Sequence, residues 1–163
     1  VDAIDIRGER RAVDYRVQVG RWMRDELPSD TTVALIPVGA IGYESRLPVL
    51  DMLGITDEHI AHRKLKIGGL AAGHEKYDTE YVLDQQPDII LLFDGLTNDP
   101  LGEAAYARLS NVFIPAAIDM VNNERLFEEY DRRAVQVGDK WLNLLVRKGA
   151  AATVRAKTEP SPQ

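Results

Sequence analysis

The feature that most constrains the fold is a continuous apolar run, Ile89–Phe93, that follows Pro87 and Asp88. The run is far shorter than the roughly 20 residues that span a bilayer, and no polar residue alternates with the apolar ones. A run of this kind is typical of a strand that is covered on both faces in a parallel sheet. We therefore expect an α/β fold, a three-layer sandwich with helices on both sides of a mostly parallel central sheet.

The other elements follow from apolar spacing and from turn residues. Strands are predicted over about 32–37 and 48–52, beside the strand at 88–93. Between the first two, Gly39–Gly42 is interpreted as a glycine turn, a natural place for a functional loop. Helices are predicted over about 11–26, 74–85 and 101–109, together with a short helix capped by Thr56. Residues 111–130 fit either a strand or a helix.

A β-hairpin is predicted at the end of the domain. Residues 133–137 and 140–147 have strand character, and Gly138 and Asp139 separate them. Gly at the first position of a two-residue turn is typical of a hairpin, so the sheet is expected to end in an antiparallel pair.

The length of 163 residues allows one domain. We assign residues 1–10 to a flexible N-terminal lead, 11–149 to a single α/β domain and 150–163 to a disordered tail. The chain begins with Val1 rather than Met, so we expect either a processed product or an excised piece of a larger protein.

Charge and cysteine content exclude several classes of function. The net charge is −6, with 20 Lys and Arg against 26 Asp and Glu, so no nucleic-acid partner is expected, because phosphate neutralisation supplies most of that affinity. The chain has no cysteine. Disulfide scaffolds, Cys-ligated zinc and thiol nucleophiles are thereby excluded.

One cluster of residues could carry chemistry. All three histidines and several carboxylates fall within 25 positions, but His59 and His62 lack the His-x-x-x-His spacing of a helical zinc site. No metal and no cofactor are therefore predicted. Gly68–Gly73 precedes a predicted helix but lacks the Lys-Ser/Thr of a phosphate-binding loop, so a connecting loop is the better interpretation. The residues of the cluster are Asp51, Asp57, His59, His62, His74 and Glu75.

Two patterns resemble a known class of protein. They are Gly-x-Ile-x-Tyr at 39–43 and Asp-x-x-Gly-x-x-Asp at 51–57, followed by Gly-His-Glu-Lys at 73–76. Together, over residues 12–95, they resemble the C-terminal soluble domain of polytopic bacterial glycosyltransferases of the GT-C class. That class includes relatives of protein mannosyltransferases and the actinobacterial cell-wall arabinofuranosyltransferases.

The resemblance implies a location and a role. It implies an extracytoplasmic domain, tethered to the membrane in the full-length protein, whose parent enzyme uses a polyprenyl-phosphate sugar donor. The catalytic carboxylate of such enzymes lies between membrane helices, so the domain alone is expected to be non-catalytic. Its expected partners are its own transmembrane region and a glycan acceptor or lipid-linked sugar. The matching positions supply a candidate polar face for sugar hydroxyls, made of Tyr43, Asp51, Asp57, His59, His74, Glu75 and Lys76.

Two alternatives stay open at this point. The first is a freestanding α/β domain that binds a small molecule such as a sugar. The second is a metal-dependent hydrolase that uses His59, His74 and Asp51. The polar face itself has an alternative role, which is to dock the domain onto the membrane part of the same protein.

Overall fold

The computed structural model describes residues 6–64, 74–93, 96–108 and 114–150. They form a mixed α/β structure around a six-stranded sheet of order β2-β1-β3-β6-β4, with β5 paired to β6. The strands are β1 (Val33–Leu35), β2 (Val49–Asp51), β3 (Ile89–Leu91), β4 (Leu96–Thr97), β5 (Tyr130–Val137) and β6 (Lys140–Arg147).

The parallel core of the sheet explains the apolar runs in the sequence. Strand β1 pairs in parallel with β2 on one side and with β3 on the other. Along β3, Ile89 and Leu91 face one hydrophobic cluster, whereas Ile90 faces another. Because both faces are covered, the strand has no polar alternation. This confirms the α/β class and the strand expected over 88–93.

The sheet is mixed rather than mostly parallel. The three remaining pairings of the described strands all involve β6 and are antiparallel. The physical reason is the predicted hairpin, which the structure confirms: Gly138 has a φ of 64° and turns β5 back into β6. Strand β6 then runs against β3 and extends the sheet in the antiparallel direction.

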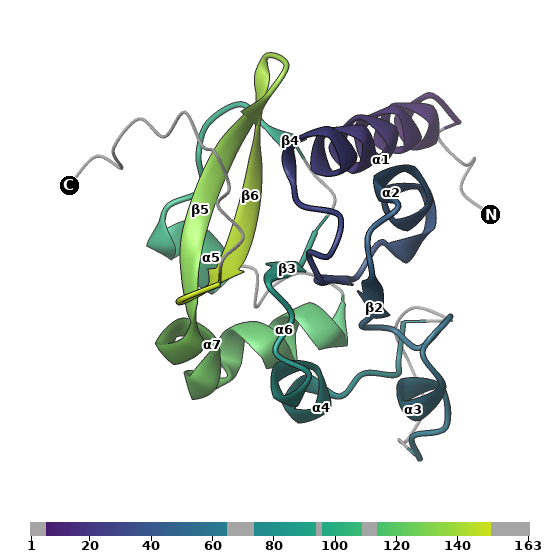
Figure 1. Cartoon of the computed structure of the whole chain (residues 1–163), viewed down its shortest axis with the longest axis vertical. Helices are drawn as coiled ribbons and strands as arrows, with labels where there is room; N and C mark the ends of the chain where they lie inside the picture. The colour runs from purple at the N-terminus through teal and green to yellow at the C-terminus, as the bar shows by residue number, and fades with distance from the viewer. Residues whose placement is uncertain (1–5, 65–73, 94–95, 109–113, 151–163) are drawn as a thin grey trace.

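Helices α1 (Ile6–Glu26) and α2 (Val38–Ser45) lie side by side on one face of the sheet (Figure 1). Helix α1 begins five residues earlier than the expected start at 11, and residues 1–5 of the predicted lead lie outside the described residues. The segment expected to form a glycine turn is helix α2. Its Ile41 is fully buried beneath α1, and this burial outweighs the weak helix propensity of the two glycines.

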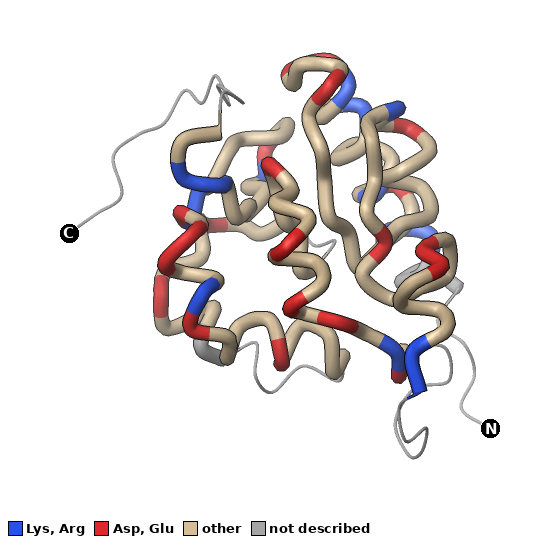
Figure 2. Tube along the Cα trace, turned by 60° about the horizontal axis from the view of Figure 1, so that its bottom comes forward, with Lys and Arg blue, Asp and Glu red and all other residues tan. Residues whose placement is uncertain are grey.

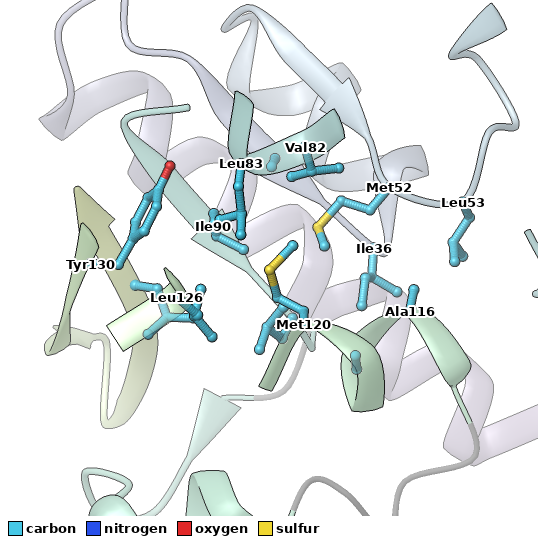
Figure 3. Close-up of a cluster of buried hydrophobic side chains, with 14 of the residues drawn as sticks. Ile36, Met52, Leu53, Val82, Leu83, Ile90, Ala116, Met120, Leu126 and Tyr130 are labelled. Carbon is cyan, nitrogen blue, oxygen red and sulfur yellow. The ribbon is translucent and has the colours of Figure 1, made fainter. Parts of the chain in front are cut away.

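The second face is covered by short helices. These helices and the strands enclose one hydrophobic cluster, to which Ile90 belongs. Figure 3 shows Met52 and Met120 with their sulfur atoms near the middle of that cluster, between Ile36, Val82 and Ile90. The ambiguous segment 111–130 is mostly helical where described, up to the start of β5 at Tyr130. The helices are α3 (Glu58–Ala61), α4 (Thr79–Asp84), α5 (Glu103–Arg108), α6 (Pro115–Asn122) and α7 (Glu124–Glu129).

Among the described residues, basic positions do not gather on one face. Figure 2 shows Lys and Arg in several short, separate stretches along the trace, with acidic positions between them. None of the described helices is both long and apolar enough to cross a membrane. Of the predicted tail at 150–163, residues 151–163 lie outside the described residues.

Candidate functional site

Asp51 shapes the turn that leaves strand β2. Its side chain is 1% exposed, and its carboxylate accepts hydrogen bonds from the backbone N–H of Leu53 at 2.9 Å and of Thr56 at 2.5 Å. The hydroxyl of Thr56 donates to the same carboxylate at 3.2 Å. Asp51 therefore satisfies the backbone of a tight turn, and Thr56 is its partner rather than the cap of the next helix.

Asp57 caps helix α3 instead. Its Oδ1 accepts the backbone N–H of Ile60 at 2.9 Å, as an N-cap residue does. Its Oδ2 accepts the hydroxyl of Tyr81 from helix α4 at 3.1 Å. Burial and the nearby Asp57 carboxylate raise the pKa of Tyr81. The cap of one helix is thus also a link to the next.

A second link joins α3 to α4 through Asp78, the N-cap of α4. His59 Nε2 lies 2.9 Å from Asp78 Oδ2, and an Arg63 nitrogen lies 2.9 Å from Asp78 Oδ1. Burial favours the neutral carboxyl, but the hydrogen bonds from His59 and the Tyr81 backbone, with the Arg63 charge, hold the pKa of Asp78 below its usual value. Asp78 is therefore a carboxylate held between two helices.

The segment before α4 completes this junction. The Lys76 ammonium donates to the carbonyl of Ala61 at the end of α3, and Arg63 donates to the carbonyl of Tyr77 at 3.2 Å. His74 and Glu75 are half-buried, and His74 Nδ1 is a buried atom without a hydrogen-bond partner in the structure. The preceding Gly68–Gly73 loop lies outside the described residues.

The predicted polar face is therefore only partly assembled. The structure brings Asp57, His59 and Lys76 together at the α3–α4 junction. Asp51 joins it only through the turn that precedes α3. Tyr43 is 84% exposed on helix α2, which Figure 1 shows on the other side of β2 from α3.

An open recess lies on the outer side of this junction. It has a volume of about 600 Å³ and is lined by Glu58, His59, His62 and Arg63. Sequence reasoning left Glu58, Arg63, Asp78 and Tyr81 out of the site. One signal for Asp78 was available, because an Asp just before an apolar helical pattern is a typical N-cap.

The histidines and carboxylates do not form a metal centre where the structure describes them. Among those residues no group of three or more His, Cys, Asp or Glu side chains is arranged to hold a metal ion. The arrangement provides instead a mixture of hydrogen-bond donors, acceptors and stacked rings.

Comparison with known proteins gives one match. A family model described as a domain of unknown function (DUF8728) matches residues 5–149. No curated protein and no solved structure matches the chain.

Proposed function

The chain belongs to the family of the domain of unknown function DUF8728, and we propose that it is the extracytoplasmic C-terminal domain of a membrane glycosyltransferase. The parent enzyme would use a polyprenyl-phosphate sugar donor in cell-envelope assembly. The domain would assist recognition of the acceptor glycan or the donor, and it would not turn over substrate alone. The resemblance of the patterns at 39–43, 51–57 and 73–76 to the soluble domain of GT-C glycosyltransferases is the sequence basis of the proposal.

The observation that supports the proposal best is where these patterns meet. His59 and Ala61 follow directly after the pattern at 51–57, Lys76 ends the pattern at 73–76, and all three take part in the α3–α4 junction. The recess opens at the same place. Sugar sites combine aromatic surface with convergent polar groups, and this junction offers both.

A recognition role fits the way the carboxylates are engaged. Asp51 binds backbone amides, and Asp57 combines a helix cap with the Tyr81 hydroxyl. A general acid or base needs a carboxyl group within reach of the substrate proton. Because both carboxyl groups hold the local fold, we propose binding rather than catalysis.

The alternatives are separated by specific observations. A freestanding sugar-binding domain would use the same recess, so the full reading frame separates it from our proposal: upstream hydrophobic segments of about 20 residues would support the membrane enzyme. The hydrolase would need His59, His74 and Asp51 around one metal. The contacts of His59 with Asp78 and of Asp51 with its own turn do not favour it.

The test is an NMR titration of the ¹⁵N-labelled chain with arabinan and mannan oligosaccharides. Affinity of about millimolar is expected, because hydroxyl hydrogen bonds largely replace those to water and stacking adds about 1 kcal/mol per ring. Concentration-dependent shifts should centre on residues 57–63 and 76–81. The absence of any saturable shift at high oligosaccharide concentration would contradict the proposal.

A further inference from the structure

Two contacts, with Tyr81 and with Asp78, fix the orientation of the His59 ring. Its ring stacks on that of Tyr81, with 4.0 Å between the ring centroids and 16° between the planes. Its Nε2 is hydrogen-bonded to Asp78 at 2.9 Å. The His59 side chain is nevertheless 50% exposed. Since Tyr81 covers one face of the ring, the opposite face and the ring edge are the parts that can be exposed.

The ring behind His59 is itself held in place. The Tyr81 hydroxyl donates to Asp57, the cap of α3, and the Tyr81 backbone N–H donates to Asp78, the cap of α4. The stacked pair is therefore attached to both helices. A surface ordered before the ligand arrives loses less conformational entropy on binding.

The polar groups around the ring form a defined set of donors and acceptors. His62 Nδ1 lies 2.8 Å from the carbonyl oxygen of Glu58, and because a carbonyl only accepts, Nδ1 carries the proton and neutral His62 presents Nε2 as an acceptor. The Asp78 carboxylate likewise only accepts, so His59 donates from Nε2 to Asp78, and neutral His59 presents Nδ1 as an acceptor. The Glu58 carboxylate adds acceptors, and Arg63 adds donors.

The charged side chains at the recess, Arg63, Asp78 and Glu58, leave no excess of positive charge. The Arg63 guanidinium is already paired with Asp78, and Glu58 adds a further negative charge to the lining. An anionic ligand would find no uncompensated cation among the four lining residues. A neutral ligand rich in hydroxyl groups fits this combination of donors and acceptors.

We propose that the outer face of His59 is a stacking platform for one neutral sugar ring, whose hydroxyl groups bind Glu58, His62 and Arg63. This inference rests on the proposed function and specifies its binding mode. The apolar C–H face of the sugar lies on the imidazole, as sugars lie on aromatic rings at one apolar surface with a wet rim.

The test compares His59→Ala with His59→Phe in the oligosaccharide titration of the full chain. His59→Ala removes the platform and should raise Kd about threefold to tenfold. His59→Phe restores a ring without the imidazole nitrogens, so it should recover most of the affinity. Tyr15→Ala is the matched control, because it removes a half-buried aromatic ring on helix α1, outside the site, and should leave Kd unchanged. Urea unfolding of each variant verifies that it is folded.

The outcomes separate the two proposals. Saturable shifts with equal Kd in wild type and His59→Ala would overturn the platform while leaving glycan recognition intact. Loss of affinity in both His59 variants would also overturn it, because the Asp78 contact rather than the ring face would then be required. Inorganic phosphate that displaces the oligosaccharide at the same residues would overturn the neutral ligand class. No saturable shift in the wild type contradicts the proposed function itself.

Discussion

At the scale of single residues, the Asp-x-x-Gly-x-x-Asp pattern has a structural explanation. Asp51 closes the turn, Gly54 lets the chain pass close to helix α3, and Asp57 starts that helix. Each position therefore does a different local task. The pattern builds the support on which His59 is presented, and two substitutions test this explanation.

Asp51→Ala should lower the free energy of unfolding by about 1–3 kcal/mol, because the buried N–H of Leu53 and the N–H of Thr56 lose their acceptor. Urea unfolding measures this as a lower midpoint at constant slope. Asp30→Ala changes an exposed aspartate and should stay within about 0.5 kcal/mol. An unchanged midpoint for Asp51→Ala would show that the turn does not depend on it.

Gly54→Ala should destabilise the fold more than Gly149→Ala. Both glycines have positive φ, 72° and 76°, so each substitution carries the strain of a left-handed residue, about 1 kcal/mol. At Gly54 an added Cβ would also lie 2.7 Å from the backbone nitrogen of Ala61, whereas nothing lies within 4 Å at Gly149. The difference between the two urea midpoints measures the close approach, and equal effects would argue against it.

At the scale of elements, the contact of α1 with α2 depends on a glycine. An added Cβ at Gly20 would lie 2.7 Å from Cβ of Glu44 and 2.9 Å from the carbonyl oxygen of Ile41. Gly20→Ala should therefore destabilise the protein by about 1–3 kcal/mol despite better helix propensity. Gly39→Ala, in open space within α2, should instead stabilise it by about 0.5–1 kcal/mol. Thermal unfolding should show a lower Tm for Gly20→Ala and a higher Tm for Gly39→Ala. A higher Tm for both variants would contradict the close contact of Gly20 with α2.

The α3–α4 link should respond to pH through Asp78. Because the pKa of this carboxyl is lowered in the folded protein, its contribution to stability is present above the unfolded pKa of about 3.9 and is lost as the pH falls through the folded pKa. Asp78→Asn retains a good helix cap without the charge. Wild type should be the more stable protein at pH 7, and the two urea midpoints should converge below about pH 4. A difference independent of pH would exclude the charge as its source.

The elements differ in how far the sequence alone predicts them. The three parallel strands were located correctly because a buried run such as Ile89–Leu91 is visible without tertiary information, whereas the two-residue strand β4 was not predicted. Helix α2 was missed because its stability comes from packing under α1, which outweighs two glycines. For the candidate site, Asp57, His59 and Lys76 were predicted from the sequence, and the structure places them at one junction; their hydrogen-bond partners lie 15–24 positions away. Nothing in local spacing reveals that Asp78 and Tyr81 meet α3.

At the scale of the whole molecule, one sheet separates two hydrophobic clusters. Met23 of α1 belongs to the first cluster and Met120 of α6 to the second, and both are fully buried. The strands β1 and β3 supply alternate residues to the two clusters. Neither cluster can lose its packing without exposing one face of the same strands, so the two faces should unfold together.

Met23→Ala and Met120→Ala should each cost about 2–5 kcal/mol, and their effects should add in the double variant because they share no contact across the sheet. Trp22, which packs against the first cluster, reports on that face when its fluorescence is measured in a Trp141→Phe background. In Met120→Ala the urea midpoint of Trp22 fluorescence should fall together with that of the far-UV circular dichroism, since the two clusters share the strands of one sheet and unfold cooperatively. A Trp22 midpoint that stays at the wild-type value while helical signal is lost would show that the two faces are separate folding units.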